Sequence, residues 1–310
     1  TISKSFVSLR LLLQVAVADL RCRFAVQIHA GRDTIRGMEN RSLSMAAVVA
    51  AVTVAGMVAF AASPDVLPPA ENQWEGARVA VFGDSITDPG QTNRQCVYWQ
   101  HLANWLKWDT GVFGVSGHRW AHLPGQIDRA EKAMGDDVDA VTIFLGTNDY
   151  ASSVPLGRWY DCVDASTNWW GKTIALKRRD LNRDRGTVRG MINVSLERIR
   201  NRWPKARVIL FTPTHREYFT CSPTNVQPGE SWPNTGGLYL DDYVACVREA
   251  ADVWGCAVVD LYRDSGLLPR LDAQRRDEFR SFDKDGLHPN SAGHLRLAKT
   301  IYCALRAISR

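Results

Sequence analysis

A serine, an aspartate and a histidine in this sequence have the types and the spacing that a hydrolase with a serine nucleophile requires. Ser85 lies in the segment Gly83-Asp84-Ser85-Ile86, which directly follows the apolar run at residues 79–82. Asp285 and His288 lie three residues apart, far downstream. A serine hydroxyl is a weak nucleophile, so it needs a base to take its proton and a carboxylate to orient that base. These residues supply all three groups.

Alternating strands and helices must position these side chains. Short, apolar, β-branched segments predict strands that are buried on both faces, at residues 78–82, 111–113, 140–145, 206–212 and 256–261. Apolar residues at helical spacing predict helices between and after them, at residues 97–105, 127–134, 188–203, 238–254 and 291–308. This alternation predicts an α/β fold with three layers, α/β/α, and a central five-stranded parallel sheet.

The candidate catalytic segments all follow predicted strands. Ser85 follows the first strand, residues 114–117 the second and residues 146–149 the third. Asp285 and His288 come after the fifth strand. In a parallel sheet the carboxyl ends of all strands lie at one edge, where α/β proteins bind their ligands. We therefore expect these distant segments to converge at that edge.

Over residues 77–310 the sequence resembles the SGNH/GDSL hydrolase family. The resemblance rests on four blocks in the family's order, namely Gly83-Asp84-Ser85-Ile86, Gly114-Val115-Ser116-Gly117, Gly146-Thr147-Asn148-Asp149 and Asp285-Gly286-Leu287-His288. It implies the flavodoxin-like SGNH hydrolase fold and the hydrolysis of carboxylic esters. It implies no cofactor, and the sequence contains no Walker A, HExxH or CxxC motif that would indicate a nucleotide or a metal.

The resemblance also implies roles for individual residues. Ser85 is expected to be the nucleophile and His288 the general base, while Asp285 fixes the imidazole tautomer. The backbone N–H groups of Ser85 and Gly117 and the side-chain amide of Asn148 are expected to bind the oxyanion of the tetrahedral intermediate.

Four further residues are expected to line the substrate pocket, namely Asp84, His118, Tyr150 and His215. Each block also has a structural interpretation. Ser85 and Gly117 are common turn residues, and Asn148 is a common helix cap. His288 would then simply precede the last helix. We favour the catalytic interpretation because all four blocks occur in order, each after a predicted strand.

The charge distribution argues against nucleic acid as a partner. The chain has 310 residues and a formal charge of +5. Residues 1–62 hold 7 Lys/Arg and 3 Asp/Glu, and subtracting these from 38 and 33 leaves 31 and 30, so residues 63–310 are nearly neutral. The basic excess therefore belongs to the N-terminal segment.

That N-terminal segment predicts export. A short polar start at residues 38–41 precedes the uncharged, Ala- and Val-rich residues 46–62, and residues 59–61 fit a small-x-small cleavage site. We expect residues 1–37 to be an upstream extension, 38–62 a signal peptide, 63–76 a linker and 77–310 the catalytic domain. The alternative for residues 46–62 is an uncleaved membrane anchor. A cleaved leader predicts a secreted protein without stable membrane insertion.

The cysteines fit an oxidising compartment. Outside residues 1–37 there are six, namely Cys96, Cys162, Cys221, Cys246, Cys256 and Cys303. An even number behind a signal peptide predicts three disulfides, and we pair Cys96 with Cys162 because both lie in loops that are expected beyond strand ends. The alternative is a set of buried free thiols.

Two long segments interrupt the alternation of strands and helices. Residues 150–186 contain Trp169 and Trp170, and residues 213–237 are rich in Pro, Thr, Gly and Asn. Both follow predicted strands, so we expect them at the ligand-binding edge. The two tryptophans either stack on a sugar or aryl group or pack in the protein.

The sequence as a whole predicts a secreted, monomeric serine esterase. Its large loops are polar, so we expect a small-molecule or glycan ester as substrate, with short acyl chains such as acetyl groups on carbohydrate. The alternatives are a lysophospholipase or thioesterase on the same scaffold, since one fold supports several activities, and a glycan-binding protein without catalysis.

Overall fold

The computed structural model of this chain describes residues 72–92 and 95–310. Our predictions for residues 1–37, for the signal peptide at 38–62 and for the linker up to residue 71 lie outside the described residues. In the part that is described, no helix combines the length and the apolar character that crossing a membrane requires.

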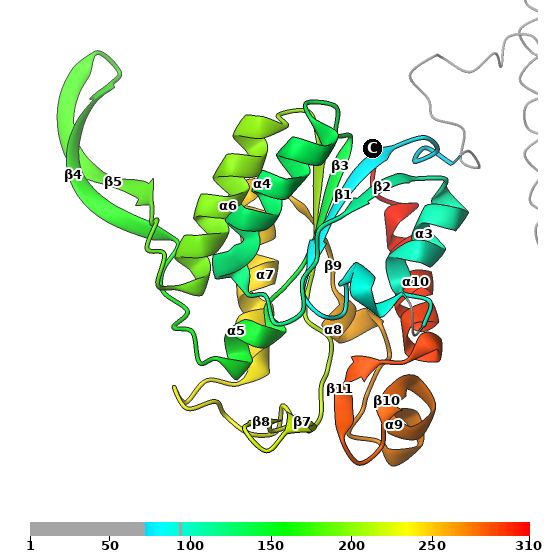
Figure 1. Cartoon of the computed structure of the whole chain (residues 1–310). Coiled ribbons are helices and arrows are strands. Elements are labelled where there is room, and N and C mark those ends of the chain that lie inside the picture. The colour runs from blue at the N-terminus through cyan, green and yellow to red at the C-terminus, as the bar shows by residue number, and fades with distance from the viewer. Residues whose placement is uncertain (1–71, 93–94) are drawn as a thin grey trace, which may run out of the picture. The chain divides into compact units, whose positions relative to one another are not determined.

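Five parallel strands form the central layer of the fold (Figure 1). They are β1 (Arg78–Gly83), β2 (Asp109–Val112), β3 (Ala140–Phe144), β6 (Arg207–Phe211) and β9 (Ala257–Val259). They lie in the order β2-β1-β3-β6-β9, and every neighbouring pair is parallel. The first strand thus lies between the second and the third, as in flavodoxin-like folds. The predicted five-stranded parallel sheet in an α/β fold is confirmed.

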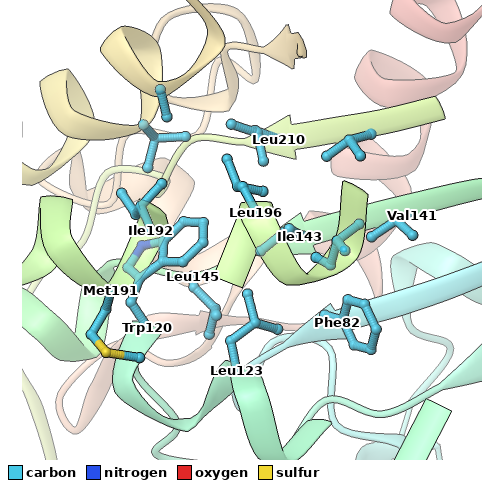
Figure 2. Packing of buried hydrophobic residues seen from close by; sticks show 14 of the residues in the cluster. Phe82, Trp120, Leu123, Val141, Ile143, Leu145, Met191, Ile192, Leu196 and Leu210 are labelled. Atoms are coloured by element: carbon cyan, nitrogen blue, oxygen red, sulfur yellow. The ribbon is translucent and has the colours of Figure 1, made fainter. Parts of the chain in front are cut away.

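Helices cover both faces of this sheet. One group consists of α4 (Leu123–Met134), α6 (Val188–Arg202) and α7 (Leu240–Trp254), and the other of α3 (Tyr98–Leu106) and α10 (Ser291–Leu305) (Figure 1). Side chains alternate along each strand, so Phe82 packs with the first group and Val81 with the second. Figure 2 shows part of the first core layer, where Leu196 of α6 lies over Ile143 of β3.

A second, smaller sheet lies beyond the carboxyl end of β6, and the sequence did not indicate it. It is antiparallel in the order β10-β11-β7-β8. Its strands are β7 (Phe219–Ser222), β8 (Asn225–Gln227), β10 (Phe279–Ser281) and β11 (Asp285–Pro289). Because β11 contains both Asp285 and His288, strand pairing holds these two residues in place.

The short helices of the described residues are η1 (Pro89–Gln91), η2 (Trp120–His122), α5 (Thr147–Ala151), α8 (Leu261–Asp264) and α9 (Asp272–Glu278).

The two long segments that interrupt the alternation, residues 150–186 and 213–237, lie in different parts of the fold. Residues 213–237 include β7, which pairs with β11, and β8, which pairs with β7, so this segment lies at the expected edge. The other segment contains a hairpin of β4 (Tyr160–Trp169) and β5 (Lys172–Leu181). This hairpin extends away from the helices and the sheets, at the upper left of Figure 1. The first residues of 150–186, at the end of α5 and at Ser153, contact the segment 213–237 at the edge, whereas the predicted position of the hairpin was wrong.

The described end of the predicted linker is packed on the domain. The ring of Trp74 is buried, and its Nε1 donates a hydrogen bond to the carbonyl of Leu305, 2.8 Å away. Asn72 Nδ2 donates to the carbonyl of Leu106 at 2.8 Å. Residues 72–76 therefore belong to the folded domain, which begins before residue 77, because an indole at position 74 fills a space beside α3 and α10.

The predicted disulfides are absent from the described residues, where all six cysteines are free. Cys162 lies on the projecting hairpin, opposite Arg179, whereas Cys96 precedes α3 on the body of the domain. The proposed pair is therefore wrong, because its two members lie on separate parts of the fold. Cys246 faces the core from α7, where burial raises the pKa of its thiol to about 12.

Candidate active site

The structure brings Ser85, His288 and Asp285 together in a continuous chain of hydrogen bonds. Ser85 Oγ lies 2.8 Å from His288 Nε2. On the other side of the ring, His288 Nδ1 lies 2.9 and 3.0 Å from the two carboxylate oxygens of Asp285. When Nδ1 carries the imidazole proton and donates a hydrogen bond to Asp285, the lone pair of Nε2 faces the serine hydroxyl. This arrangement can take a proton from Ser85 during nucleophilic attack.

Local backbone structure fixes each member of this chain. Asp285 Oδ1 accepts the backbone N–H of His288 at 2.9 Å, so the strand itself orients the carboxylate. The ring of Phe219 on β7 packs edge-on against the imidazole, with centroids 4.9 Å apart. At the end of β1, the N–H groups of Thr87 and Asp88 both donate to the carbonyl of Asp84. This tight turn places Ser85 at the edge of the sheet.

The expected oxyanion donors lie next to each other. Asn148 Nδ2 donates to the carbonyl of His118 at 3.0 Å and to Asp84 Oδ2 at 3.3 Å. Gly117 has φ +79°, and a Cβ built on it would meet nothing within 4 Å. The need for glycine there is therefore conformational, since other residues rarely adopt this φ. Both amide hydrogens of Asn148 are engaged, and the long contact to Asp84 is the weaker one.

A buried arginine supports this region, and the sequence did not point to it. Arg216 is 1% exposed. Its Nη1 donates to the carbonyl and the hydroxyl of Thr147, at 3.3 and 3.1 Å. Its Nη2 donates to Gln227 Oε1 at 2.6 Å. The guanidinium thus links β8 to the residue that precedes Asn148.

Two carboxyl groups beneath the site are fully buried. Burial raises the pKa of Asp84 to about 7, although the positive charge of Arg216 opposes this shift. Burial also raises the pKa of Asp149 to about 7, while hydrogen bonding to the backbone N–H of Trp120 opposes the shift. Burial lowers the pKa of Arg216 to about 10. The site therefore rests on a low-dielectric layer in which charge is costly.

The four predicted pocket residues divide into two pairs. Asp84 and Tyr150 are about 1% exposed, and the Tyr150 hydroxyl donates to the carbonyl of Trp232 at 2.7 Å. They support the site from within and do not line a pocket, which corrects our prediction for both.

The other pair is partly exposed. His118 stacks on His122, with ring centroids 4.6 Å apart, and its Nδ1 lies 3.0 Å from Gln126 Nε2. His215 Nδ1 lies 2.7 Å from Glu230 Oε1, and its ring packs on Tyr262 at 3.8 Å. Both imidazoles are therefore held in defined orientations. Within residues 72–92 and 95–310, no three His, Cys, Asp or Glu side chains form a group that could hold a metal ion.

Comparison with known proteins agrees with this geometry. The model of the GDSL-like Lipase/Acylhydrolase family matches residues 81–296, a range that includes all four sequence blocks. No curated protein matches the chain. One solved structure is 26% identical, with a TM-score of 0.59, and the match covers 77% of this chain and 100% of that chain.

Two further solved structures share the fold. A protein from Lactobacillus plantarum is 24% identical with a TM-score of 0.55, over 75% of this chain and 98% of that one. A possible lipase from Chitinophaga pinensis is 21% identical with a TM-score of 0.56, over 74% of this chain and 98% of that one. At these identities the likeness concerns the fold alone.

Proposed function

Because this chain belongs to the GDSL-like lipase/acylhydrolase family, we propose that it is a serine esterase that forms an acyl-enzyme on Ser85. The observation that carries the proposal is the 2.8 Å contact between Ser85 Oγ and His288 Nε2, with Asp285 held 2.9 Å from Nδ1. Secretion is part of the proposal and rests on the predicted signal peptide at residues 38–62.

The reaction proceeds in two halves. In the first, His288 Nε2 takes the proton of Ser85 as Oγ attacks the ester carbonyl carbon. The tetrahedral oxyanion is bound by the N–H groups of Ser85 and Gly117 and by Asn148 Nδ2, which gives up its 3.3 Å contact with Asp84. His288 then donates its proton to the departing alkoxide. In the second half, water repeats the attack and releases the acid.

We propose that the substrates carry short acyl groups, such as acetyl esters of carbohydrates. His118, which follows β2, and His215, which follows β6, are both polar and partly exposed. Glu230 also accepts a hydrogen bond from Arg270 Nη2 at 2.7 Å, so the loop of residues 213–237 is fixed by charged contacts. Polar, fixed surroundings suit a small acyl group on a hydrophilic alcohol better than a long alkyl chain.

A ladder of p-nitrophenyl esters from acetyl to palmitoyl tests both parts of the proposal. The full chain should hydrolyse the short esters, and Ser85→Ala should lower kcat by about 10³-fold or more. Turnover that survives in Ser85→Ala contradicts the serine mechanism. A higher kcat/KM for a decanoyl than for an acetyl ester contradicts the short-chain preference and favours a lysophospholipase-like activity. Binding of an acetylated glycan without turnover favours a non-catalytic protein.

A further inference from the structure

The distal part of the β4–β5 hairpin exposes large apolar side chains. Trp169 is 56% exposed and Trp170 is 91% exposed. Ile174 and Leu176 are 36% and 48% exposed on the neighbouring strand. Exposed apolar groups scattered singly are ordinary, but a contiguous group marks a surface that binds something.

Trp169, Ile174 and Leu176 share one face of the hairpin. Residues alternate between the faces of a strand, and directly opposed residues lie on the same face. Trp169 is opposite Lys172, Thr167 is opposite Ile174, and Ala165 is opposite Leu176. The other face carries polar residues, with Asn168 opposite Thr173 and Asp164 opposite Lys177. The hairpin is therefore an amphipathic ribbon with one apolar side.

The turn at its tip presents a tryptophan at a position where tryptophan is unusual. Trp170 and Gly171 have φ values of +55° and +77°, the pattern of a two-residue type I′ turn that favours Asn-Gly. The Trp170 ring is almost fully exposed, so no packing within the described residues accounts for it. A binding surface at the tip would account for a large apolar ring there.

Within the described residues, the polar contacts of residues 162–179 stay inside the hairpin. Lys177 pairs with Asp164 at 2.7 Å, and Arg178 pairs with Asp180 at 2.7 Å. Figure 1 shows the ribbon standing clear of the helices and sheets. An isolated two-stranded hairpin is only marginally stable in water, so covering its apolar face would also stabilise it.

We propose that the distal half of this hairpin, residues 165–176, docks on a phospholipid surface that contains anionic lipids. Tryptophan is the side chain that prefers the boundary between lipid and water. The apolar face carries two cationic side chains, Lys172 opposite Trp169 and Arg178 opposite Val163, and no Asp or Glu from residue 163 to residue 178, which complements the charge of anionic headgroups. The exposed ion pair of Arg178 with Asp180 contributes little stability, so a lipid phosphate can replace this carboxylate. The docking is peripheral and does not span the bilayer.

A second copy of the chain fits this face less well. Two ten-residue strands, at about 3.4 Å per residue and about 5 Å per strand, give a face of roughly 340 Å². Two such faces would bury roughly 700 Å² in all, which is below the 1,200 Å² or so of stable interfaces. Face-to-face packing would also bring Lys172 and Arg178 of the two copies together.

Docking through the hairpin leaves the catalytic edge open to water. In Figure 1 the hairpin rises at the upper left, while β7, β8 and β11 lie at the bottom. The site then faces away from the lipid surface. This orientation suits a water-soluble substrate, and it lets the docking and the esterase activity be tested separately.

Tryptophan fluorescence of the full chain with vesicles gives a local readout of docking. The vesicles contain phosphatidylcholine with or without 30% phosphatidylglycerol, and their acyl chains are brominated so that they quench tryptophan on contact. The test variant is Trp169→Thr/Trp170→Asn, because Thr favours strands and Asn favours the type I′ turn. The matched control is Trp232→Thr, which removes another exposed tryptophan (66%) from outside the hairpin.

Brominated anionic vesicles should quench the wild type and the control equally, and Trp169→Thr/Trp170→Asn should lose most of that quenching. Its partition onto these vesicles should fall about tenfold or more, and Lys172→Gln/Arg178→Gln should weaken binding about fivefold per charge removed. Equal quenching of the wild type and Trp169→Thr/Trp170→Asn overturns the proposal, even if residues 46–62 bind both chains to the vesicles. If the wild type forms a dimer that this variant dissociates, the apolar face binds a second copy of the chain. If only the wild type binds an insoluble glycan, the apolar face binds glycan. Either result contradicts docking on lipid.

Discussion

Removing the guanidinium of Arg216 should weaken catalysis and stability together. The side chain makes three hydrogen bonds, to the carbonyl and hydroxyl of Thr147 and to Gln227. Its positive charge also opposes the rise in the pKa of Asp84 that burial causes. In Arg216→Met all of these interactions are lost, while the acceptors stay buried.

The expected magnitude follows from burial. Removing a buried donor costs about 1–3 kcal/mol for each acceptor that is left unpaired, so we expect the loss of these three hydrogen bonds to cost about 3–5 kcal/mol. For a domain of about this size, each kcal/mol lowers Tm by roughly 2–4 °C, so we expect a fall of roughly 10 °C. Thr147 precedes Asn148, and a misplacement of about 1 Å at a reacting group costs about 10²-fold. We therefore expect kcat to fall about 10- to 100-fold, with a smaller change in KM.

The assay is hydrolysis of p-nitrophenyl acetate well below the Tm of the variant, together with thermal unfolding followed by circular dichroism. Arg216→Lys should lie between the wild type and Arg216→Met, because an ammonium restores the charge but not the planar fork. Arg198→Met is the matched control, since Arg198 makes ion pairs with Asp128 and Glu131 on the helical layer. If Arg216→Met keeps kcat within threefold and Tm within about 2 °C of the wild type, the argument is refuted.

Three further predictions concern single residues. Asn148→Ala should lower kcat by roughly 10²–10³ with little change in KM; steady-state kinetics test this, and an unchanged kcat removes Asn148 from the oxyanion site. The pKa of Asp149 is raised to about 7 from about 3.8 by burial, so the stability it contributes is complete below about pH 4 and is lost as the pH rises through 7. Urea unfolding at pH 5 and pH 9 should therefore show a loss of a few kcal/mol in the wild type. Asp149→Asn should reduce this loss by about half, because the buried Asp84, whose pKa is also raised to about 7, keeps its own share; equal pH dependence in both proteins would count against the raised pKa of Asp149. Trp74→Ala should lower the free energy of unfolding by about 3–5 kcal/mol, and a variant as stable as the wild type would mean that residues 72–76 are not part of the folded domain.

The central sheet was predictable because its three inner strands are buried on both faces. Residues of β1, β3 and β6 are almost all apolar, and the predicted segments match the observed strands to within two residues. The second sheet gave no such signal. Its strands have three to five residues, which is too short for a local period to mark them. The pairing of β7 with β11, which joins its two hairpins, also spans a long stretch of chain.

The site was predictable to the extent that strand ends converge. Ser85, Asp285 and His288 come together because β1 ends at the edge where the second sheet begins. Arg216 was not predictable, since nothing in its neighbourhood distinguishes it from the many exposed arginines of this chain. The disulfide prediction failed for a related reason, because counting cysteines says nothing about which parts of the fold carry them.

The packing of residues 72–74 against the end of α10 brings the two ends of the folded domain side by side. Gln73 Nε2 donates to the carbonyl of Ile308 at 2.9 Å, and Gln73 Oε1 accepts the backbone N–H of Arg310 at 3.2 Å. A short peptide could therefore join residue 310 to residue 72 without disturbing the sheet. New termini could then be opened at Gly171, the exposed tip of the hairpin, so this domain is suited to circular permutation and to insertion as a unit into a loop of another protein.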